Sequence, residues 1–491
     1  MQNISRKTKI VCTIGPASDN KETLIKLLNA GMSCMRINFS HGSYEEHQKK
    51  IDLMHEVEKE VGFCVPIMLD TKGPEIRCHD FEGGKVTILD KSIVRISMKP
   101  VLGTAEKFSV TFENLYDDCH IGSSIRIDDG KLELIVKEKD EKNRELVCEA
   151  QNTHPISNKK GVNVPGVHLS LPFISEKDHN DLVFGCKNDV DYVAASFVRN
   201  VQDIKDIRKI LEENGKPNIK IITKVENCEC LDCLEEVVDA SDGIMVARGD
   251  LGVEIPAAEV PIVQIQLINM CRKKGKPVIT ATQMLDSMVT NPNPTRAEVS
   301  DVATAVTESS DCVMLSAESA SGLYPVESVA MQARIARTME KVLPYEKLAQ
   351  EAYETSSKNN NDAIANSIAN TALLIEAKLI VCFTETGRTA FRISKARPCC
   401  PIVTITNNRK TANLAGIYWG VFPTYIESLK MPDFIEEMEA IAVKAAQDYN
   451  IPAGSNIIVA GGTPTGSGNT NFMRIIRVPS TKDVSSLWKK F

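Results

Sequence analysis

The sequence contains no apolar run long enough to cross a lipid bilayer, for which about 20 consecutive apolar residues are needed. It also has no excess of basic residues, because 58 basic residues against 65 acidic ones give a net charge of −7. That balance argues against general binding to nucleic acid or to an anionic membrane. A small anionic ligand remains compatible with it, since local charge would hold such a ligand. We therefore expect neither nucleic-acid nor membrane partners.

The cysteines lack the pattern of a disulfide framework. There are 15 of them, an odd number, and they are scattered through apolar segments. The basic residues 1–9 are not followed by the apolar stretch of a signal peptide. We therefore expect reduced thiols in a cytoplasmic protein. Cys228, Cys230 and Cys233 resemble a metal cluster, but no second cysteine or histidine pair lies nearby, and we interpret them as the start of an amphipathic helix.

No low-complexity tract is present, and the only repeat is an alternation of strands and helices. At 491 residues the chain is too long for one ordinary domain. Residues 1–72 alternate between short apolar strands and helices, which predicts parallel pairing. We expect strands at residues 9–14, 33–37 and 65–69, and helices at residues 20–30 and 44–61, the second one opened by a capping box of Ser43 and Glu46.

The helical period disappears between residues 73 and 165. Short β-rich runs follow one another there, and Asp129-Gly130 between two of them is a hairpin signal. We expect a small β-barrel domain, inserted between a strand and its helix, that acts as a lid. Its strands are predicted at residues 86–89, 93–98, 124–127, 132–137 and 146–150.

The strand–helix alternation resumes over residues 166–345, with a second capping signature at Ser175 and Asp178. Three strands before the insert and five after it make eight, each followed by a helix, which favours a closed (β/α)8 TIM barrel over an open sheet. The later strands are expected at residues 191–195, 219–223, 243–246, 277–281 and 312–315, and helices at residues 201–213, 228–238, 259–274, 296–308 and 326–342.

Residues 346–491 form a further predicted unit, a C-terminal α/β regulatory domain. Residues 345–361 are polar and are interpreted as a linker. Alternation then begins again. We expect strands at residues 380–383, 402–406, 421–424, 457–460 and 473–478. Helices are expected at residues 362–379 and 434–449, and a further helix follows the strand 380–383 and ends at residue 396.

The most informative stretch is residues 221–227, an apolar strand that ends in Lys224 and Glu226. Residues i and i+2 of a strand share a face, so both side chains point into one space. An ion pair that caps the strand is the simple alternative. An ammonium beside an oxygen ligand also suits a divalent cation and a phosphate.

Active sites of such barrels lie at the C-terminal ends of the strands, and polar residues gather at those positions. Glu226 and Asp250 are oxygen ligands of the type that Mg²⁺ prefers. Arg36 and Arg77 match phosphate groups, and Gly249 leaves backbone amides accessible to an anion. The oxygen donors Asn38, Ser40, Asp70 and Thr71 could hold a monovalent cation. The set as a whole indicates phosphoryl transfer, which relies on positioning and charge neutralisation.

Other residues fit this reading less directly. Asp128-Asp129 is first of all a hairpin turn, with a lid contact to nucleotide or metal as the alternative. Lys160 lies where the insert rejoins the barrel and is a candidate lid cation for nucleotide. His41 and His47 flank a helix start and are interpreted as structural. Glu318 could orient the cationic groups from behind.

Five long motifs closely resemble the pyruvate kinase family, and the resemblance spans essentially the whole chain. They are MRINFSHG at residues 35–42, LDTKGPEIR at 69–77, ITKVEN at 222–227, MVARGDLGVEIP at 245–256 and TATQMLDSM at 280–288. The resemblance implies conversion of phosphoenolpyruvate and ADP into pyruvate and ATP in glycolysis. It also implies dependence on Mg²⁺ (or Mn²⁺) and K⁺, allosteric control and a homotetramer.

The resemblance assigns roles residue by residue. Arg36 binds the substrate phosphate, Lys224 stabilises the phosphoryl group in transfer, and Gly249, Asp250 and Thr282 contact substrate, the threonine near the face where the enolate is protonated. Glu226 and Asp250 hold Mg²⁺. Asn38, Ser40, Asp70 and Thr71 match the family's K⁺ ligands, and Glu75 matches the glutamate that accompanies K⁺ dependence. The nucleotide contacts are matched by Asn38, Arg77 and Lys160.

Some segments depart from the family pattern or bear on regulation. Residues 316–319 read SAES where SGET is usual, a small steric change. The loop 461–468 lacks the Trp and Arg of animal members. A sugar-phosphate effector is expected at a hydroxyl-rich loop that contains Thr384, Thr386, Gly387, Arg388 and Thr389. Two other functions remain open from the residues alone, a metal-dependent lyase acting on a pyruvate enolate and a non-catalytic sugar-phosphate sensor.

Overall fold

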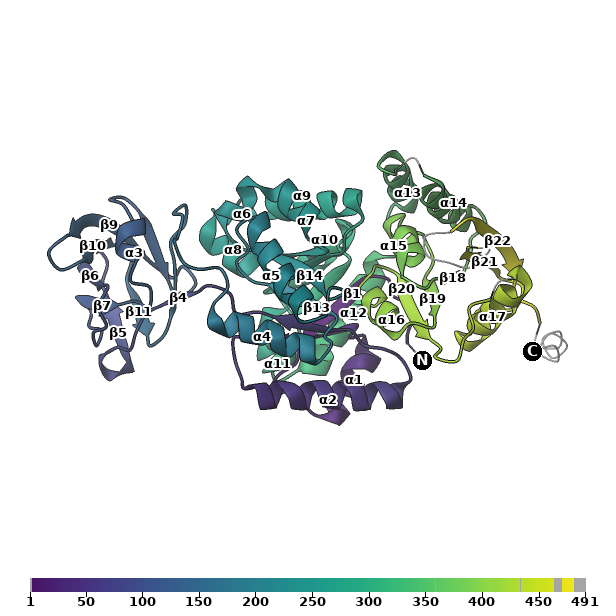
Figure 1. Cartoon of the computed structure of the whole chain (residues 1–491), viewed down its shortest axis with the longest axis horizontal. Helices are drawn as coiled ribbons and strands as arrows, with labels where there is room; N and C mark the ends of the chain where they lie inside the picture. The colour runs from purple at the N-terminus through teal and green to yellow at the C-terminus, as the bar shows by residue number, and fades with distance from the viewer. Residues whose placement is uncertain (1, 358, 433, 463–469, 481–491) are drawn as a thin grey trace.

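The computed structural model describes residues 2–357, 359–432, 434–462 and 470–480. Figure 1 shows three parts in a row: a β-rich lobe, a central barrel and a C-terminal α/β part. The loop 461–468, singled out for its lack of Trp and Arg, lies mostly outside the described residues. Among the described residues no helix is long and apolar enough to cross a membrane.

Eight parallel strands close the central barrel, as predicted, in the order β1-β17-β16-β15-β14-β13-β3-β2. They are almost wholly buried because helices cover the outside, which explains their near-continuous apolar sequence. The strands are β1 Lys9–Thr13, β2 Cys34–Asn38, β3 Ile67–Asp70, β13 Tyr192–Ala195, β14 Lys220–Val225, β15 Gly243–Ala247, β16 Val278–Ala281 and β17 Cys312–Leu315.

Both predicted capping boxes of the barrel helices are present, at Ser43 and at Ser175. The helix predicted over residues 228–238 is broken at Cys233, whose backbone leaves the helical region at φ −127° and ψ 35°. The short helix α8 was not predicted. The barrel helices are α1 Lys21–Ala30, α2 Tyr44–Val61, α4 Glu176–Lys187, α5 Val201–Glu213, α6 Cys228–Asp232, α7 Leu234–Ala240, α8 Arg248–Glu254, α9 Val260–Lys274, α10 Arg296–Thr307, α11 Ala317–Ala320 and α12 Pro325–Met339.

The inserted lobe has its own apolar core and a seven-stranded sheet in the order β4-β12-β8-β9-β10-β6-β7. A bridge between Cys78 and Val110 joins its two edges, so the sheet curls toward a small barrel. The predicted hairpin is present, since β8 and β9 are antiparallel and Asp128 and Asp129 adopt positive φ. The elements are β4 Ile76–Arg77, β5 Lys85–Ile88, β6 Ile93–Ser97, β7 Lys107–Ser109, α3 Leu115–Asp118, β8 Ser124–Ile127, β9 Leu132–Asp140, β10 Glu145–Ala150, β11 His154–Ser157 and β12 Gly161–Asn163.

The C-terminal part is a five-stranded sheet in the order β20-β19-β18-β21-β22, flanked by helices. The linker prediction for residues 345–361 was wrong over most of its length, because α13 forms there and buries Leu348, Ala349 and Ala352. The elements are α13 Tyr345–Glu354, α14 Asn360–Leu374, β18 Leu379–Phe383, α15 Arg388–Lys395, β19 Ile402–Thr406, α16 Arg409–Ala415, β20 Val421–Tyr425, α17 Ile435–Asp448, β21 Asn456–Gly461 and β22 Phe472–Arg477.

The C-terminal part covers the N-terminal end of the barrel. Tyr192, at the start of β13, donates a hydrogen bond of 2.5 Å to the Leu414 carbonyl. Leu414, Ile417 and Tyr418 pack against apolar side chains inside the strands. The opposite end, where the strands finish, therefore remains for the functional groups and faces the lobe.

Candidate functional site

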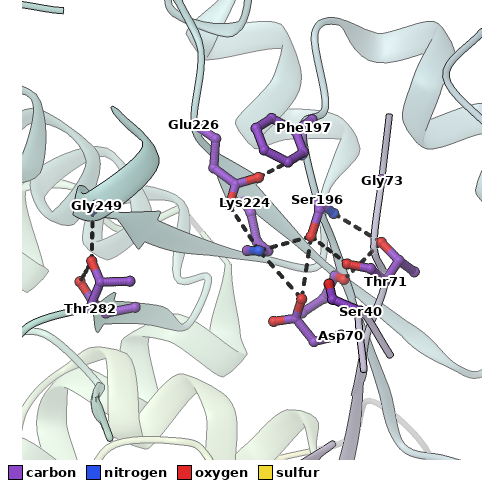
Figure 2. A network of polar contacts seen from close by, with 12 residues as sticks. Ser40, Asp70, Thr71, Gly73, Ser196, Phe197, Lys224, Glu226, Gly249 and Thr282 are labelled. Atoms are coloured by element: carbon purple, nitrogen blue, oxygen red, sulfur yellow. Dashed lines mark hydrogen bonds and ion pairs between the residues drawn. The ribbon is translucent and has the colours of Figure 1, made fainter. Parts of the chain in front are cut away.

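The strand-end residues converge in the structure as the barrel geometry predicts. The register pairs Asn38 of β2 with Asp70 of β3. Lys224 and Glu226 follow two strands further round the barrel, and Figure 2 shows their side chains facing Asp70 and Ser196. Five side chains from four successive strand ends thus share one space.

Lys224 is at the centre of this network, with only 9% of its surface exposed. Its ammonium donates hydrogen bonds to Ser196 Oγ at 2.8 Å and to Asp70 Oδ1 at 3.3 Å. It also lies 2.8 Å from Glu226 Oε1. The ion pair with Glu226 that the strand spacing left open is present, but it belongs to a larger buried network.

Burial and charge act against each other on these groups. Burial favours the neutral form of Lys224, but Asp70 and Glu226 outweigh it and raise the pKa of the ammonium. Burial acts in the opposite direction on Asp70, where Arg36 and Lys224 lower the pKa. For Glu226, burial together with nearby Asp250 raises the pKa to about 7 despite Lys224. Lys224 and Asp70 are therefore held as an ion pair.

Arg36 is fixed on the other side of Asp70. Its Nε donates to Asp70 Oδ2 at 2.7 Å, and its Nη1 donates to Thr13 Oγ1 at 2.7 Å. Both partners come from the ends of neighbouring strands. The guanidinium is thus pre-oriented, which lowers the entropy cost of binding an anion.

Glu226 fits the role of a metal ligand. Its Oε2 accepts a hydrogen bond of 2.6 Å from the Phe197 amide. Its Oε1 is buried without a hydrogen-bond partner, since the Lys224 ammonium approaches it outside hydrogen-bonding angles. Asp250 lies in the first turn of α8 and lines both cavities at the barrel mouth, of about 510 Å³ and 770 Å³. No cluster of three or more metal-binding side chains occurs in residues 2–357 or the later described segments.

The four residues predicted for K⁺ lie on two adjacent strand ends, with Ser40 just beyond β2. Asn38 Oδ1 accepts a hydrogen bond of 3.0 Å from the Ser40 amide. Thr71 Oγ1 accepts one of 3.1 Å from the Ser196 amide. Asp70 is shared with Arg36 and Lys224, so any cation here would also lie beside these two basic side chains.

The Gly249 amide, which the sequence predicts to be accessible to an anion, has a hydrogen-bond partner within the protein. The Gly249 amide donates to Thr282 Oγ1 at 2.8 Å, and that hydroxyl in turn donates to the Ala281 carbonyl at 2.6 Å. Thr282 adopts an uncommon positive φ of 68°. Arg248 secures the same loop by donating to the carbonyls of Ala281 and Thr282 while it pairs with Asp301 at 2.6 Å. This hydrogen bond therefore fixes Gly249 and Thr282 next to each other at the mouth of the barrel.

Arg77 and Lys160 line the 510 Å³ cavity together with Asp250, so lobe and barrel residues face the same space. Arg77 pairs with Glu75 at 2.8 Å. Lys160 pairs with Asp128 at 2.6 Å. Burial opposes ionisation of Asp128, but hydrogen bonds from Lys160 and His154 lower its pKa to about 2. Both cations are thus held at the cavity wall by carboxylates.

Sequence reasoning missed Thr13 and Ser196. Thr13 ends the first barrel strand as Asp70 ends the third, and Ser196 comes directly after the fourth. Reading every strand end, including these two, could have found them. Their small hydroxyl side chains gave no other signal, because serine and threonine are common in loops.

Two further predictions have a structural outcome. Glu318 is buried and accepts hydrogen bonds from the amides of Leu285 and Ser316, so it fixes loops and not the cationic groups. His47 is buried and stacks on Phe39 at 4.1 Å, in agreement with a structural role.

The predicted effector loop joins β18 to α15 in the C-terminal part, far from the barrel mouth (Figure 1). Thr384 Oγ1 accepts a hydrogen bond of 3.0 Å from the Gly387 amide. Thr389 shares a hydrogen bond of 2.6 Å with Thr470. Thr386 and Arg388 are exposed.

Comparisons with known proteins agree over nearly the full length. The family model described as "Pyruvate kinase, barrel domain" matches residues 5–329, and "Pyruvate kinase, alpha/beta domain" matches residues 362–476. Pyruvate kinases of Staphylococcus haemolyticus and Staphylococcus aureus strain MRSA252 are 49% and 50% identical over 472 residues, which cover 96% of this chain and 80% of each relative. The crystal structure of a pyruvate kinase from Cryptosporidium parvum has a TM-score of 0.90 at 39% identity and covers 97% of both chains.

Proposed function

This chain belongs to the pyruvate kinase family, and from that premise we propose how its residues carry out the reaction. The enzyme transfers the phosphoryl group of phosphoenolpyruvate to ADP and forms pyruvate and ATP, the last step of glycolysis. The observation that supports our assignment is the position of Lys224 between two carboxylates and a hydroxyl at the barrel mouth.

Lys224 and Arg36 bind and neutralise the phosphoryl group in this proposal. Both are permanent cations held in place by Asp70. Charge on the transferring oxygens is then stabilised by groups that need little reorganisation, which is the main source of rate in phosphoryl transfer. Thr282 lies beside Gly249 near the second cavity, which supports its assignment to the face where the enolate receives a proton.

Glu226 and Asp250 hold Mg²⁺ or Mn²⁺, and Asn38, Ser40, Asp70 and Thr71 hold K⁺. The buried Oε1 of Glu226, which has an ion pair with Lys224 but no hydrogen bond, supports the first assignment, and the adjacent oxygen donors on β2 and β3 support the second. A bound divalent cation supplies charge to the phosphate oxygens and orients them. Arg77 and Lys160 from the lobe and Asn38 from the barrel bind the nucleotide in this proposal.

Regulation and assembly form the remaining part of the proposal. A sugar phosphate binds at the loop that contains Thr384, Thr386, Gly387, Arg388 and Thr389, whose exposed Arg388 suits a phosphate. The enzyme is a cytoplasmic homotetramer under allosteric control. Sedimentation tests the assembly, and phosphoenolpyruvate saturation curves with and without sugar phosphates test the effector, since relief of sigmoidality is the expected result.

The catalytic assignment is tested by measuring ATP formation from phosphoenolpyruvate and ADP. We expect activity with Mg²⁺ and K⁺, loss of it with a chelator, and strong reduction when an organic cation replaces K⁺ at equal ionic strength. Glu226→Gln and Asp250→Asn are expected to weaken Mn²⁺ binding measured by electron paramagnetic resonance. Unchanged Mn²⁺ affinity in both variants would contradict the metal assignment. It would not contradict the assignment of the pyruvate kinase reaction to this chain.

A further inference from the structure

Cys399 and Cys400 are the one pair of adjacent cysteines in the sequence. They lie in the loop between α15 and β19, bounded by Pro398 and Pro401. Both thiols are free, and Cys399 is half-buried whereas Cys400 is only 4% exposed. A reachable thiol is thus held next to a shielded one on a loop that two prolines restrict.

The surroundings of Cys399 favour its thiolate. Interaction with the adjacent Cys400 thiol lowers the pKa of Cys399 to about 7, burial opposes this, and Lys7 and Lys378 assist it. Cys233 is also half-buried, but there burial raises the thiol pKa. Because the thiolate is the reactive form, Cys399 is more nucleophilic than Cys233.

The same loop anchors the C-terminal part to the barrel. Arg397, two residues before Cys399, pairs with Asp311 at 2.7 Å and donates to the Ser309 carbonyl at 2.9 Å. Its guanidinium lies 5.0 Å from the centre of the Trp419 ring. Lys7, whose charge acts on both thiols, donates from its backbone amide to Glu340 at 2.8 Å. The two cysteines therefore lie directly beside this joint.

We propose that Cys399 and Cys400 form a peroxide-sensitive dithiol whose oxidation loosens the joint between the barrel and the C-terminal part. The geometry that supports this is a reachable thiol, a buried partner one peptide bond away, and an interdomain anchor in the same loop. Hydrogen peroxide is the oxidant.

The chemistry proceeds in two steps. The Cys399 thiolate attacks one peroxide oxygen, the O–O bond breaks, and hydroxide leaves and takes a proton to become water, which makes Cys399 a sulfenic acid. The Cys400 sulfur then attacks the Cys399 sulfur and loses its proton, and the sulfenic oxygen departs as water. Two thiols and one peroxide thus become one disulfide and two waters.

Such a disulfide is strained and therefore easily reduced. Consecutive Cα atoms are about 3.8 Å apart across a trans peptide, whereas disulfides usually need about 4.4–6.8 Å. The backbone of the loop must shift to accommodate the bond, which is how oxidation reaches Arg397. Strained disulfides have more oxidising potentials, and thiol reductants restore them readily.

The test treats the full-length protein with a small excess of hydrogen peroxide and follows each cysteine by peptide mass spectrometry. We expect the peptide with Cys399 and Cys400 to lose two hydrogens, to regain them with dithiothreitol, and to react at least ~10-fold faster than Cys233. Cys400→Ser is expected to stop at a sulfenic acid that dimedone traps, and Cys399→Ser to give neither product. Cys233→Ser is the matched control and keeps the wild-type behaviour.

Hydrogen exchange tests the effect on the joint. Exchange in α16 and at Trp419 is expected to rise in the oxidised wild type and not in Cys399→Ser treated in the same way. Equal reactivity of Cys399 and Cys233, or a wild-type product that stays a sulfenic or sulfinic acid with Cys400 free, overturns the dithiol. A disulfide that leaves exchange in α16 unchanged overturns the effect on the joint. The wild-type measurements decide both points even where a variant fails to fold.

Discussion

A buried ammonium is costly unless carboxylates compensate it, and Lys224 meets this condition with Asp70 and Glu226. Arg36 shares Asp70 from the other side. Two cations and two anions therefore balance within one small volume. We expect Lys224 to lose Glu226 as a partner when that carboxylate binds a cation, which leaves the ammonium to face the phosphate.

Replacement of this lysine tests whether its charge acts mainly in the transition state. We expect Lys224→Met to lower kcat by about 10³-fold or more while Mn²⁺ still binds. Lys220→Met is the matched control, because Lys220 begins the same strand but pairs with Asp242 at the opposite end of the barrel. Steady-state kinetics of both variants provide the measurement. Near-normal turnover in Lys224→Met would refute the assigned role.

Ser196 is expected to be a positioning residue for the same lysine. Its hydroxyl lies 2.8 Å from the Lys224 ammonium, accepts from it, and donates to the Thr71 carbonyl at 2.6 Å. A hydrogen bond to a charged group contributes about 1.5–3 kcal/mol, so Ser196→Ala should lower kcat about 10–100-fold. Little change in the KM for ADP is expected, since Arg77 and Lys160, the cations proposed to bind nucleotide, belong to the lobe. Ser196→Thr, which keeps the hydroxyl, should recover part of the rate, and a loss of the same size in both variants would count against the role.

The sequence could predict most of this site because one rule, that barrel sites lie at strand ends, selects the right positions. Lys224, Glu226 and Asp70 follow from it directly. The bond between Gly249 and Thr282 could not be predicted, since it joins two different strand ends through a backbone shape that local patterns do not encode. Tertiary contacts of this kind require the structure.

At the scale of elements, hydrogen bonds connect the lobe to α8, the helix that contains Gly249 and Asp250. Asn163 of β12 donates a hydrogen bond of 3.0 Å to Glu254 at the end of α8. Arg126 of β8 donates to the Val253 carbonyl. The position of the lobe, with the two cations proposed to bind nucleotide, is thus tied to the helix that carries a proposed metal ligand.

Removal of a hydrogen bond between the lobe and α8 should therefore weaken the binding of nucleotide more than the binding of phosphoenolpyruvate. Asn163→Ala loses one hydrogen bond worth about 1 kcal/mol, so we expect the KM for ADP to rise roughly 5-fold. Asn143→Ala is the control, because Asn143 bonds Asp140 in an exposed turn of the same lobe. Initial-rate kinetics with each substrate varied in turn distinguish the two. An equal rise in both KM values would speak for general damage to the site.

Element boundaries show where sequence patterns fail. The polar segment before residue 362 suggested a linker, yet α13 forms because Leu348, Ala349 and Ala352 fall on one face and pack inward. Only part of that face is strongly apolar, so its period was easy to miss. The eight-stranded barrel was predictable because many strand–helix units repeat the same signal.

At the scale of the whole molecule, one end of the barrel carries the chemistry and the other is closed by the C-terminal part. Buried polar contacts hold that joint. Asn413 donates to Asp191 at 3.1 Å, and Arg397 pairs with Asp311 at 2.7 Å. Within one chain, this joint is therefore the connection between the proposed effector loop and the barrel.

The pair of Arg397 and Asp311 gives the sharpest test of how much the joint stabilises the molecule. Both side chains are less than 10% exposed, so removal of one partner leaves a buried charge, which typically costs about 3–5 kcal/mol. We expect Arg397→Ala to lower the free energy of unfolding by that amount in urea, followed by the fluorescence of Trp419, which lies against Arg397. Arg144→Ala is the control, because its pair with Asp117 is about half exposed and such pairs contribute at most about 1 kcal/mol. The double variant with Asp311→Ala should lose less than the sum of the single losses, since no charge is left unpaired, and strict additivity would show that the two side chains stabilise the joint independently.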